Sequence, residues 1–164
     1  MLLRQQSVCL NTGDEAPEFS LENHRGQVVS LKDFRGKENV LVVLHPGDLD
    51  EACKGYLRFY KDHLSDFSAF ETQVISINMD SPQKNMEWID EVGELGFPLL
   101  SDSLPLGDIT LKYDCFVPEE GYGKRAVFLV DKRGTIRHIE VLSGEANACP
   151  DLNKLLDIIH NLQH

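Results

Sequence analysis

The chain has 164 residues and a formal net charge of −11 at pH 7. This length suits one domain with a full-sized core, and the negative charge argues against general binding to nucleic acid or to anionic membranes. No segment reaches the roughly 18 consecutive apolar residues of a membrane span. The first ten residues also lack the apolar core of a signal peptide. We therefore expect a cytoplasmic protein that binds neither nucleic acid nor membrane.

The first half of the chain reads as short strands around one helix. Residues 1–12 are expected to form a loose N-terminal tail, and residues 13–164 a single domain. Short apolar or β-branched runs bounded by turn residues predict strands. The expected strands are at 19–22, 28–30, 39–44 and 73–79, with a helix at about 51–67 between the last two.

The second half is expected to combine helices with a β-hairpin. Ser81 followed by Pro82 is a strong helix start, because Ser caps free backbone N–H groups and Pro fits the first helical position. Residues 131–134 read as the turn of a hairpin. The other expected elements are an extended segment at 97–100, a short helix at 106–113, strands at 126–130 and 136–141, and a last helix from about 150.

This order of elements predicts an α/β fold. A strand–helix–strand unit over 39–79 makes a parallel pair with a right-handed crossover, and the hairpin adds antiparallel strands. The expected result is a mixed sheet with helices on both faces. In such sheets ligands usually bind beyond the carboxyl ends of the strands. Cys53 follows the strand at 39–44 and is therefore expected at this edge.

Cys53 is the most informative residue of the chain. On the first turn of a helix, free backbone N–H groups and the helix dipole favour an anion. A thiol there ionises closer to neutral pH, and the thiolate is the nucleophile. Arg125, directly before a predicted strand, would supply a fixed positive charge. From the residues alone, Cys53 as an ordinary buried cysteine and Arg125 as a surface side chain stay open as alternatives.

The other chemistry-bearing residues point away from metals and bound cofactors. The four cysteines, Cys9, Cys53, Cys115 and Cys149, include no C-x-x-C pair, which argues against structural zinc and dithiol exchange. In a reducing compartment these thiols are expected to be free. The six histidines are scattered, and no glycine-rich phosphate loop is present. We expect no metal site and no cofactor.

Four sequence blocks stand in a specific order: GDEAPEF at 13–19, VVSLKDFRGK at 28–37, FPLLSD at 97–102 and RAVFLVD at 125–131. Together they resemble the peroxiredoxins of the alkyl hydroperoxide reductase and thiol-specific antioxidant superfamily. The resemblance covers about residues 12–160. It implies a thioredoxin-like fold, that is, a mixed sheet flanked by helices on both faces.

The active-site motif of that family, P-x-x-x-T/S-x-x-C, is matched in spacing by Pro46, Asp50 and Cys53. The resemblance implies that Cys53 is the peroxidatic cysteine, that Pro46 shields the pocket from water, and that Arg125 stabilises the thiolate and polarises the peroxide. Two residues depart from the pattern. Asp50 replaces the family's Thr or Ser, and Tyr56 stands where Glu is common.

The chemistry of Asp50 allows three roles for its side chain. If ionised, its carboxylate cannot donate a hydrogen bond, and it repels the neighbouring thiolate. If burial keeps it protonated, it can donate. It can also act as the N-cap of the following helix, because Asp is a favoured cap residue.

The activity implied by the resemblance is that of an antioxidant oxidoreductase, a thiol-dependent peroxidase for hydrogen peroxide or alkyl hydroperoxides. No cysteine stands five residues after Cys53, so a one-cysteine mechanism is the default. Cys149 and Cys115 are the candidate resolving cysteines. The implied partners are a peroxide substrate, a thiol reductant such as a thioredoxin-like protein, and a second copy of the chain in a homodimer.

Two other functions stay open at this point. Asp50 and Tyr56 favour a thioredoxin-fold binding or redox-sensing module in which peroxidase activity is weakened or lost. A thiol–disulfide oxidoreductase is a further alternative, against which the absence of C-x-x-C argues.

Overall fold

The computed structural model describes residues 10–44, 51–103, 108–113, 116–117, 122–123, 125–142 and 151–162. Its centre is a mixed sheet of seven strands in the order β2-β1-β5-β4-β3-β8-β9. The strands are β1 (Ser20–Asn23), β2 (Val28–Ser30), β3 (Asn39–Leu44), β4 (Thr72–Asn78), β5 (Leu99–Ser101), β8 (Arg125–Val130) and β9 (Ile136–Leu142). A separate pair consists of β6 (Phe116–Val117) and β7 (Tyr122–Gly123).

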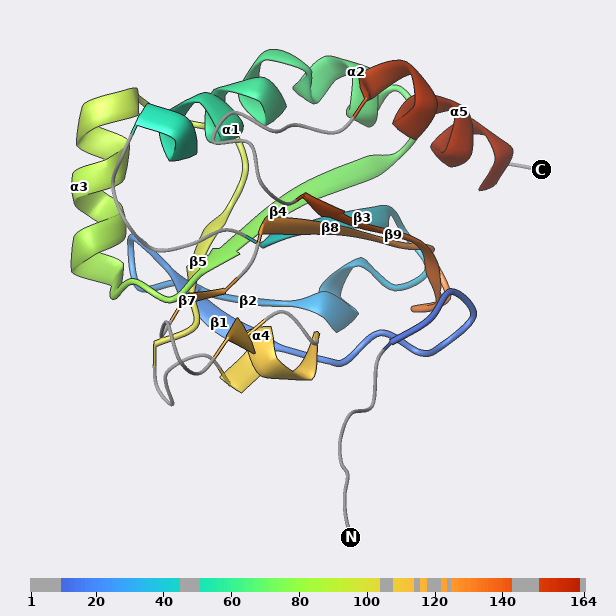
Figure 1. The fold of residues 1–164 in the computed structure, drawn as a ribbon, viewed down its shortest axis with the longest axis horizontal. Helices are drawn as coiled ribbons and strands as arrows, with labels where there is room; N and C mark the ends of the chain where they lie inside the picture. Colours follow the sequence, from blue (N-terminus) through green and yellow to red (C-terminus); the bar gives the residue numbers. More distant parts are fainter. Residues whose placement is uncertain are drawn as a thin grey trace, which may run out of the picture.

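Helices lie on both faces of the sheet (Figure 1). They are α1 (Glu51–Asp62), α2 (Leu64–Ser68), α3 (Pro82–Val92), α4 (Asp108–Lys112) and α5 (Leu152–Leu162), together with the 3-10 helix η2 (Leu31–Phe34). Buried side chains of α1, α2, α3 and α5 form one core cluster with the sheet. The opposite face packs against η2, α4 and the segment before β1. The predicted mixed sheet with helices on both faces is confirmed. None of the described helices has the length and apolar character needed to cross a bilayer.

The central strand β3 explains how one short run of sequence serves two cores. All six residues of its NVLVVL sequence are buried. Because successive side chains of a strand point to opposite faces, Leu41 and Val43 join the cluster beneath α1. Val40, Val42 and Leu44 join the cluster on the other face. A continuous apolar run is what a strand covered on both faces requires.

The chain between β4 and β5 forms a well-capped helix, as predicted. The Ser81 hydroxyl accepts a hydrogen bond from the Lys84 backbone N–H at 3.2 Å, and Pro82 occupies the first turn. Gly93 ends α3 with a positive φ of 85°, a conformation that costs a glycine little. The fully buried Trp88 anchors the helix in the core.

Two features of the fold differ from the sequence prediction. The helix expected at about 51–67 is two helices, because α1 ends at Asp62 and α2 begins at Leu64 after a break at His63. Phe67 of α2 is buried in the same cluster as Leu57 of α1, so the apolar spacing continues across the break and hides it. The two-residue strands β6 and β7 were also unpredicted, since they are too short to show a period.

The segment before β1 is tied to the β8–β9 hairpin. Gly13 N–H donates to the Ile136 carbonyl, and Ile136 N–H donates to the Asp14 carbonyl, both at 2.8 Å. Leu10 packs against the second core cluster. Of the predicted N-terminal tail, residues 1–9 lie outside the described residues.

Asp102 holds α4 in place at the end of β5. Its carboxylate is 1% exposed and accepts hydrogen bonds from the backbone N–H of Ile109 at 3.0 Å and of Thr110 at 2.7 Å. The Thr110 hydroxyl donates a third at 2.7 Å. These bonds satisfy backbone donors of the first helical turn, which have no partner inside the helix.

Replacing Asp102 with Ala should lower the free energy of unfolding by about 2–4 kcal/mol, because buried donors lose a charged acceptor. Urea denaturation followed by circular dichroism measures this change. The control is Asp90→Ala on the exposed side of α3, which should change stability by less than about 0.5 kcal/mol. Equal stabilities of the two variants would show that Asp102 does not hold α4.

Candidate active site

The sheet register brings the start of β8 next to the end of β3. The two strands are antiparallel, and Leu44, the last residue of β3, lies opposite Ala126. Arg125, the first residue of β8, therefore follows in register directly beyond the end of β3. The end of β3 and the start of β8 both belong to the predicted site. They are far apart in sequence but lie at the same end of the strands of the sheet.

Helix α1 places Cys53 in its first turn, as the sequence predicts. The helix begins at Glu51, so Cys53 is its third residue. Further along α1, Leu57 and Tyr60 are fully buried in the cluster that includes Leu41 and Val43 of β3. This packing fixes the axis of α1 over the sheet. The first-turn backbone N–H groups of such a helix have no partner within it.

The remaining predicted site residues lie outside the described residues. Pro46 and Asp50 fall in 45–50, Cys115 in 114–115 and Cys149 in 143–150. For Cys53, Tyr56 and Arg125 the structure describes the backbone but not the side chain. The predicted roles of all these side chains stay predictions, and the sheet register and the start of α1 are what the structure adds to them.

A buried polar network supports the same edge of the sheet and was missed by the sequence analysis. The Asn78 side-chain amide at the end of β4 donates to Asn85 Oδ1 at 2.7 Å. Asn85 of α3 donates in turn to the Ser101 hydroxyl at the end of β5 at 2.9 Å. This chain of bonds ties two parallel strands to α3. Its sequence signal is weak: polar residues directly at the ends of apolar runs.

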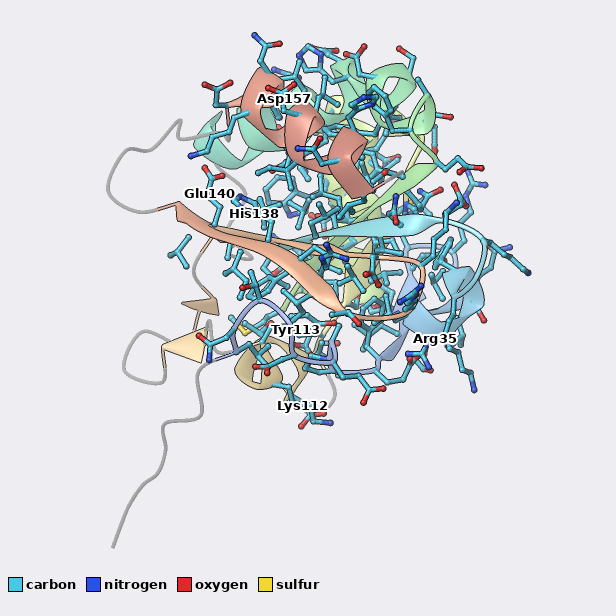
Figure 2. The ribbon with its side chains drawn as sticks, turned by 90° about the vertical axis from the view of Figure 1, so that its right-hand side faces the viewer. Arg35, Lys112, Tyr113, His138, Glu140 and Asp157 are labelled. Atoms are coloured by element: carbon cyan, nitrogen blue, oxygen red, sulfur yellow. The ribbon has the colours of Figure 1, made fainter. Side chains whose placement is uncertain are left out.

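Tyr113 secures the opposite face of the sheet (Figure 2). Its hydroxyl donates to the Pro17 carbonyl at 2.7 Å, and its ring packs edge-on against Phe128 of β8 with 5.0 Å between ring centroids. Burial, and secondarily the negative charge of Glu18, raise the pKa of Tyr113 well above its usual range. The phenol therefore stays protonated and acts as a hydrogen-bond donor that holds the segment before β1.

Metal-ligating side chains are dispersed over the described part of the chain. Among those residues, no three His, Cys, Asp or Glu side chains gather closely enough to hold a metal ion. Within the described residues, the candidate site consists of the end of β3, the start of α1 and the start of β8.

Comparison with known proteins identifies the family. The family model described as "AhpC/TSA family" matches residues 12–139. The chain belongs to the AhpC/TSA family. The resemblance to peroxiredoxins that the sequence blocks indicated is thereby confirmed.

Relatives within the AhpC/TSA family cover most of the chain. Alkyl hydroperoxide reductase E of Mycobacterium tuberculosis is 36% identical over 132 residues, which cover 80% of this chain and 86% of that protein. Peroxiredoxin 1 of Picrophilus torridus is 30% identical over 157 residues, covering 92% of this chain and 67% of that protein.

Solved structures confirm the thioredoxin-like peroxiredoxin fold. The reduced 2-Cys peroxiredoxin of Plasmodium vivax superimposes with a TM-score of 0.81 at 24% identity, covering 93% of this chain and 82% of that one. Peroxidoxin BcpB of Mycobacterium tuberculosis also gives a TM-score of 0.81, at 18% identity, and covers 93% of this chain and 98% of that one. At these identities the likeness concerns the fold alone.

Packing of α1 on the sheet should depend on Leu57. Leu57→Ala is expected to lower the free energy of unfolding by about 2–5 kcal/mol, because it leaves a cavity in a fully buried site. Chemical denaturation checks this value. The adjacent exposed residue gives the control, since Arg58→Ala should cost less than about 0.5 kcal/mol. If Leu57→Ala lowered the free energy of unfolding by less than about 1 kcal/mol, the packing of α1 on the sheet would be contradicted.

Proposed function

We propose that this AhpC/TSA family member is a thiol-dependent peroxidase in which Cys53 is the reacting cysteine. Membership in the family and relatives named alkyl hydroperoxide reductase and peroxiredoxin support this reaction class. The proposed substrates are hydrogen peroxide or alkyl hydroperoxides. The match of Pro46, Asp50 and Cys53 to the spacing of the family's motif selects Cys53 among the four cysteines.

The observation that carries the proposal is the position of residue 53 in the first turn of α1, at the carboxyl end of β3. A sulfur anion at a helix N-terminus is stabilised by free backbone N–H groups and by the helix dipole. Val127 and Leu129 of β8 belong to the cluster beneath α1. The two-residue period of a strand assigns position 125 to that same face. Arg125 is therefore the proposed source of fixed positive charge.

The proposed reaction balances with one peroxide and two reducing thiols. The Cys53 thiolate attacks the terminal peroxide oxygen, an S–O bond forms and the O–O bond breaks. The leaving alkoxide or hydroxide takes a proton and departs as alcohol or water, and Cys53 is left as a sulfenic acid. Arg125 and the helix N–H groups stabilise charge on the oxygens. One thiol then displaces water to form a mixed disulfide, and a second thiol releases Cys53.

We propose that the reducing thiols come from a thioredoxin-like protein and that the mechanism is of the one-cysteine type. Cys149 and Cys115 are the alternative resolving cysteines within the chain. We further propose a cytoplasmic homodimer, in keeping with the composition and with the resemblance to peroxiredoxins. None of these finer assignments is needed for the reaction at Cys53.

A second function, redox sensing without efficient turnover, is favoured by one feature of the motif. Asp50 stands in place of the family's Thr or Ser, and an ionised carboxylate near a thiolate raises the thiol pKa. A sensing module would be oxidised at Cys53 but would not complete the catalytic cycle at a useful rate. Measurement of steady-state turnover separates the two functions.

Replacement of Cys53 by Ser should abolish peroxide consumption with dithiothreitol as reductant, by at least roughly 100-fold, because the nucleophile is removed. Cys149→Ser and Cys115→Ser are the matched controls. Both should keep the wild-type rate, since a small dithiol reduces the sulfenic acid directly.

The same assay distinguishes the alternatives. Equal rates for Cys53→Ser and wild type would refute the assignment of Cys53. A wild-type chain that forms a sulfenic acid at Cys53 once, but shows no steady-state turnover, would identify the sensing function instead.

A further inference from the structure

Positive charge is concentrated at the end of the molecule opposite the candidate active site. Six of the chain's 16 Lys and Arg residues fall in two segments, 31–38 and 131–137, although the chain as a whole carries −11. The cations are Lys32, Arg35, Lys37, Lys132, Arg133 and Arg137. The same segments contain three carboxylates, Asp33, Glu38 and Asp131. The two segments are joined by a hydrogen bond from Gly36 N–H to the Lys132 carbonyl at 2.8 Å.

The β8–β9 hairpin carries three of these cations, Lys132 and Arg133 in its turn and Arg137 in β9, and the turn is held by Asp131. Its carboxylate accepts hydrogen bonds from the backbone N–H of Arg133 at 2.9 Å and of Thr135 at 3.0 Å. Oδ2 of the same carboxylate pairs with Arg137 Nη1 at 3.2 Å. The one acidic group of the turn thus has its charge taken up by three donors. These bonds fix the backbone of the turn from which Arg133 projects, and the ion pair with Asp131 holds the Arg137 guanidinium.

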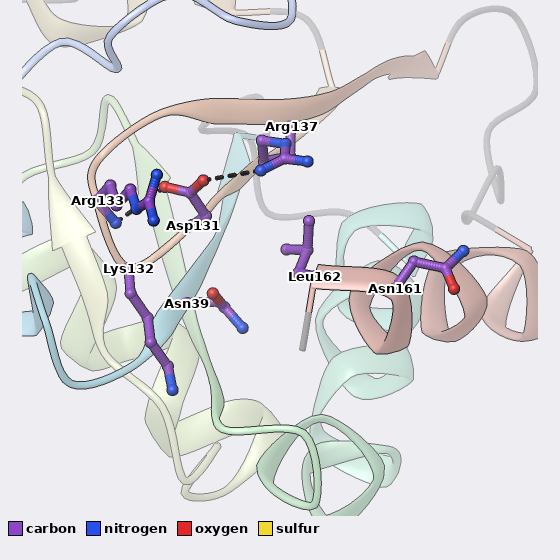
Figure 3. A pocket seen from close by; sticks show the side chains of 7 residues that line it. All are labelled: Asn39, Asp131, Lys132, Arg133, Arg137, Asn161 and Leu162. Carbon is purple, nitrogen blue, oxygen red and sulfur yellow. Dashed lines mark hydrogen bonds and ion pairs between the residues drawn. The ribbon is translucent and has the colours of Figure 1, made fainter. Parts of the chain in front are cut away.

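A pocket of about 410 Å³ opens beside this turn, as Figure 3 shows. Its lining consists of the three cations Lys132, Arg133 and Arg137, the Asp131 carboxylate that pairs with Arg137, and the side chains of Asn39, Asn161 and Leu162. Its lining thus comes from the start of β3, the hairpin and the last turn of α5. The volume lies within the range of roughly 300–1,000 Å³ that is typical of small-molecule sites.

The three cations of the pocket differ in whether they form ion pairs with carboxylates of the protein. Lys132 pairs with Glu71 at 2.6 Å, and Arg137 uses only Nη1 toward Asp131. Within the described residues, no carboxylate lies within ion-pair distance of Arg133. Its guanidinium is thus available, in a place where most of the protein's surface would repel an anion.

We propose that this pocket binds a small molecule that carries a phosphate or pyrophosphate group. Arg133 and the free nitrogens of Arg137 hold the anionic oxygens, because the planar guanidinium fork matches their geometry. The amide of the exposed Asn161 contacts polar groups on the rest of the ligand, whereas Asn39 is buried and its amide nitrogen donates to the Phe70 carbonyl and the Thr72 hydroxyl. Asn39 begins β3 and Leu44 ends it, so roughly 17 Å of strand separates this pocket from the candidate active site. The proposal does not depend on the peroxidase reaction.

Titration of the full-length chain with inorganic pyrophosphate tests this proposal. Isothermal titration calorimetry at low ionic strength should show saturable one-to-one binding with a Kd below about 1 mM, weakened by added salt. Arg133→Gln should weaken binding several-fold, because the ligand loses a positively charged hydrogen-bond donor. Arg133→Glu should weaken binding by at least about tenfold, because it places a negative charge beside the anion. Arg133 is exposed, so the fold should survive both changes.

Two control variants make the result specific. Lys154→Glu makes the same charge reversal on an exposed residue near the other end of α5, and it should leave Kd within about twofold. Cys53→Ser should bind as the wild type does, which separates the pocket from the thiol chemistry. Absence of saturable binding to the wild type, or equal weakening by Lys154→Glu and Arg133→Glu, would overturn the proposal.

Discussion

The antiparallel pairing of β3 with β8 is the contact on which the rest of the structure depends. Five residue pairs, from Val40 opposite Val130 to Leu44 opposite Ala126, align two strands that are buried on both faces. Their alternate side chains supply the centres of both core clusters. A slip of one residue would turn every side chain to the wrong face. The same register fixes what stands at each end of the pair.

The two ends of this strand pair have different chemistry. At the carboxyl end of β3, the register sets the start of β8 beside Leu44, the last residue of β3. At the amino end, the β8–β9 hairpin with its three cations lies beside Asn39 and the end of α5. The ladder between β3 and β8 therefore places the candidate thiol site and the candidate anion pocket at opposite ends of the same strand pair.

The thiol chemistry depends on a balance of charges around Cys53. An ionised Asp50 at about 4 Å would oppose the thiolate by roughly 4 kcal/mol at an effective dielectric constant near 20. The helix dipole returns up to about 2 kcal/mol. In the proposed peroxidase, Arg125 and direct N–H hydrogen bonds to sulfur would supply the difference when Asp50 is ionised, and a protonated Asp50 would remove the repulsion.

Local sequence signals predicted the elements that local physics determines. The β-branched run of β3, the Ser81–Pro82 start of α3 and the turn at 131–134 have their own signatures, and the structure confirms all three. The break at His63 was hidden, because the core accepts the same apolar spacing on both sides of it. The antiparallel pairing of β1 with β5 and the bonds from Asn78 through Asn85 to Ser101 depend on tertiary contacts that no sequence period reveals.

In the candidate site, too, some features have a local sequence signal and others depend on tertiary contacts. A motif spacing was enough to propose Cys53 as the reacting cysteine, and an apolar strand with Arg125 at its start was enough to propose its partner. That the two segments share one edge of the sheet follows only from the register of β3 and β8. The candidate anion pocket had no signal in the sequence, because its lining comes from β3, the hairpin and α5, which only the folded chain brings together.

The acidity of the Cys53 thiol tests the central claim most directly. The rate of alkylation by iodoacetamide, measured against pH on a variant in which the other three cysteines are Ser, reports the thiol pKa. We expect a pKa clearly below the free-cysteine value of about 8.5, and a higher pKa when Arg125 is replaced by Gln. A pKa at or above about 8.5 in the parent chain, unchanged by Arg125→Gln, would contradict the claim that positive charge at this edge of the sheet activates the thiol.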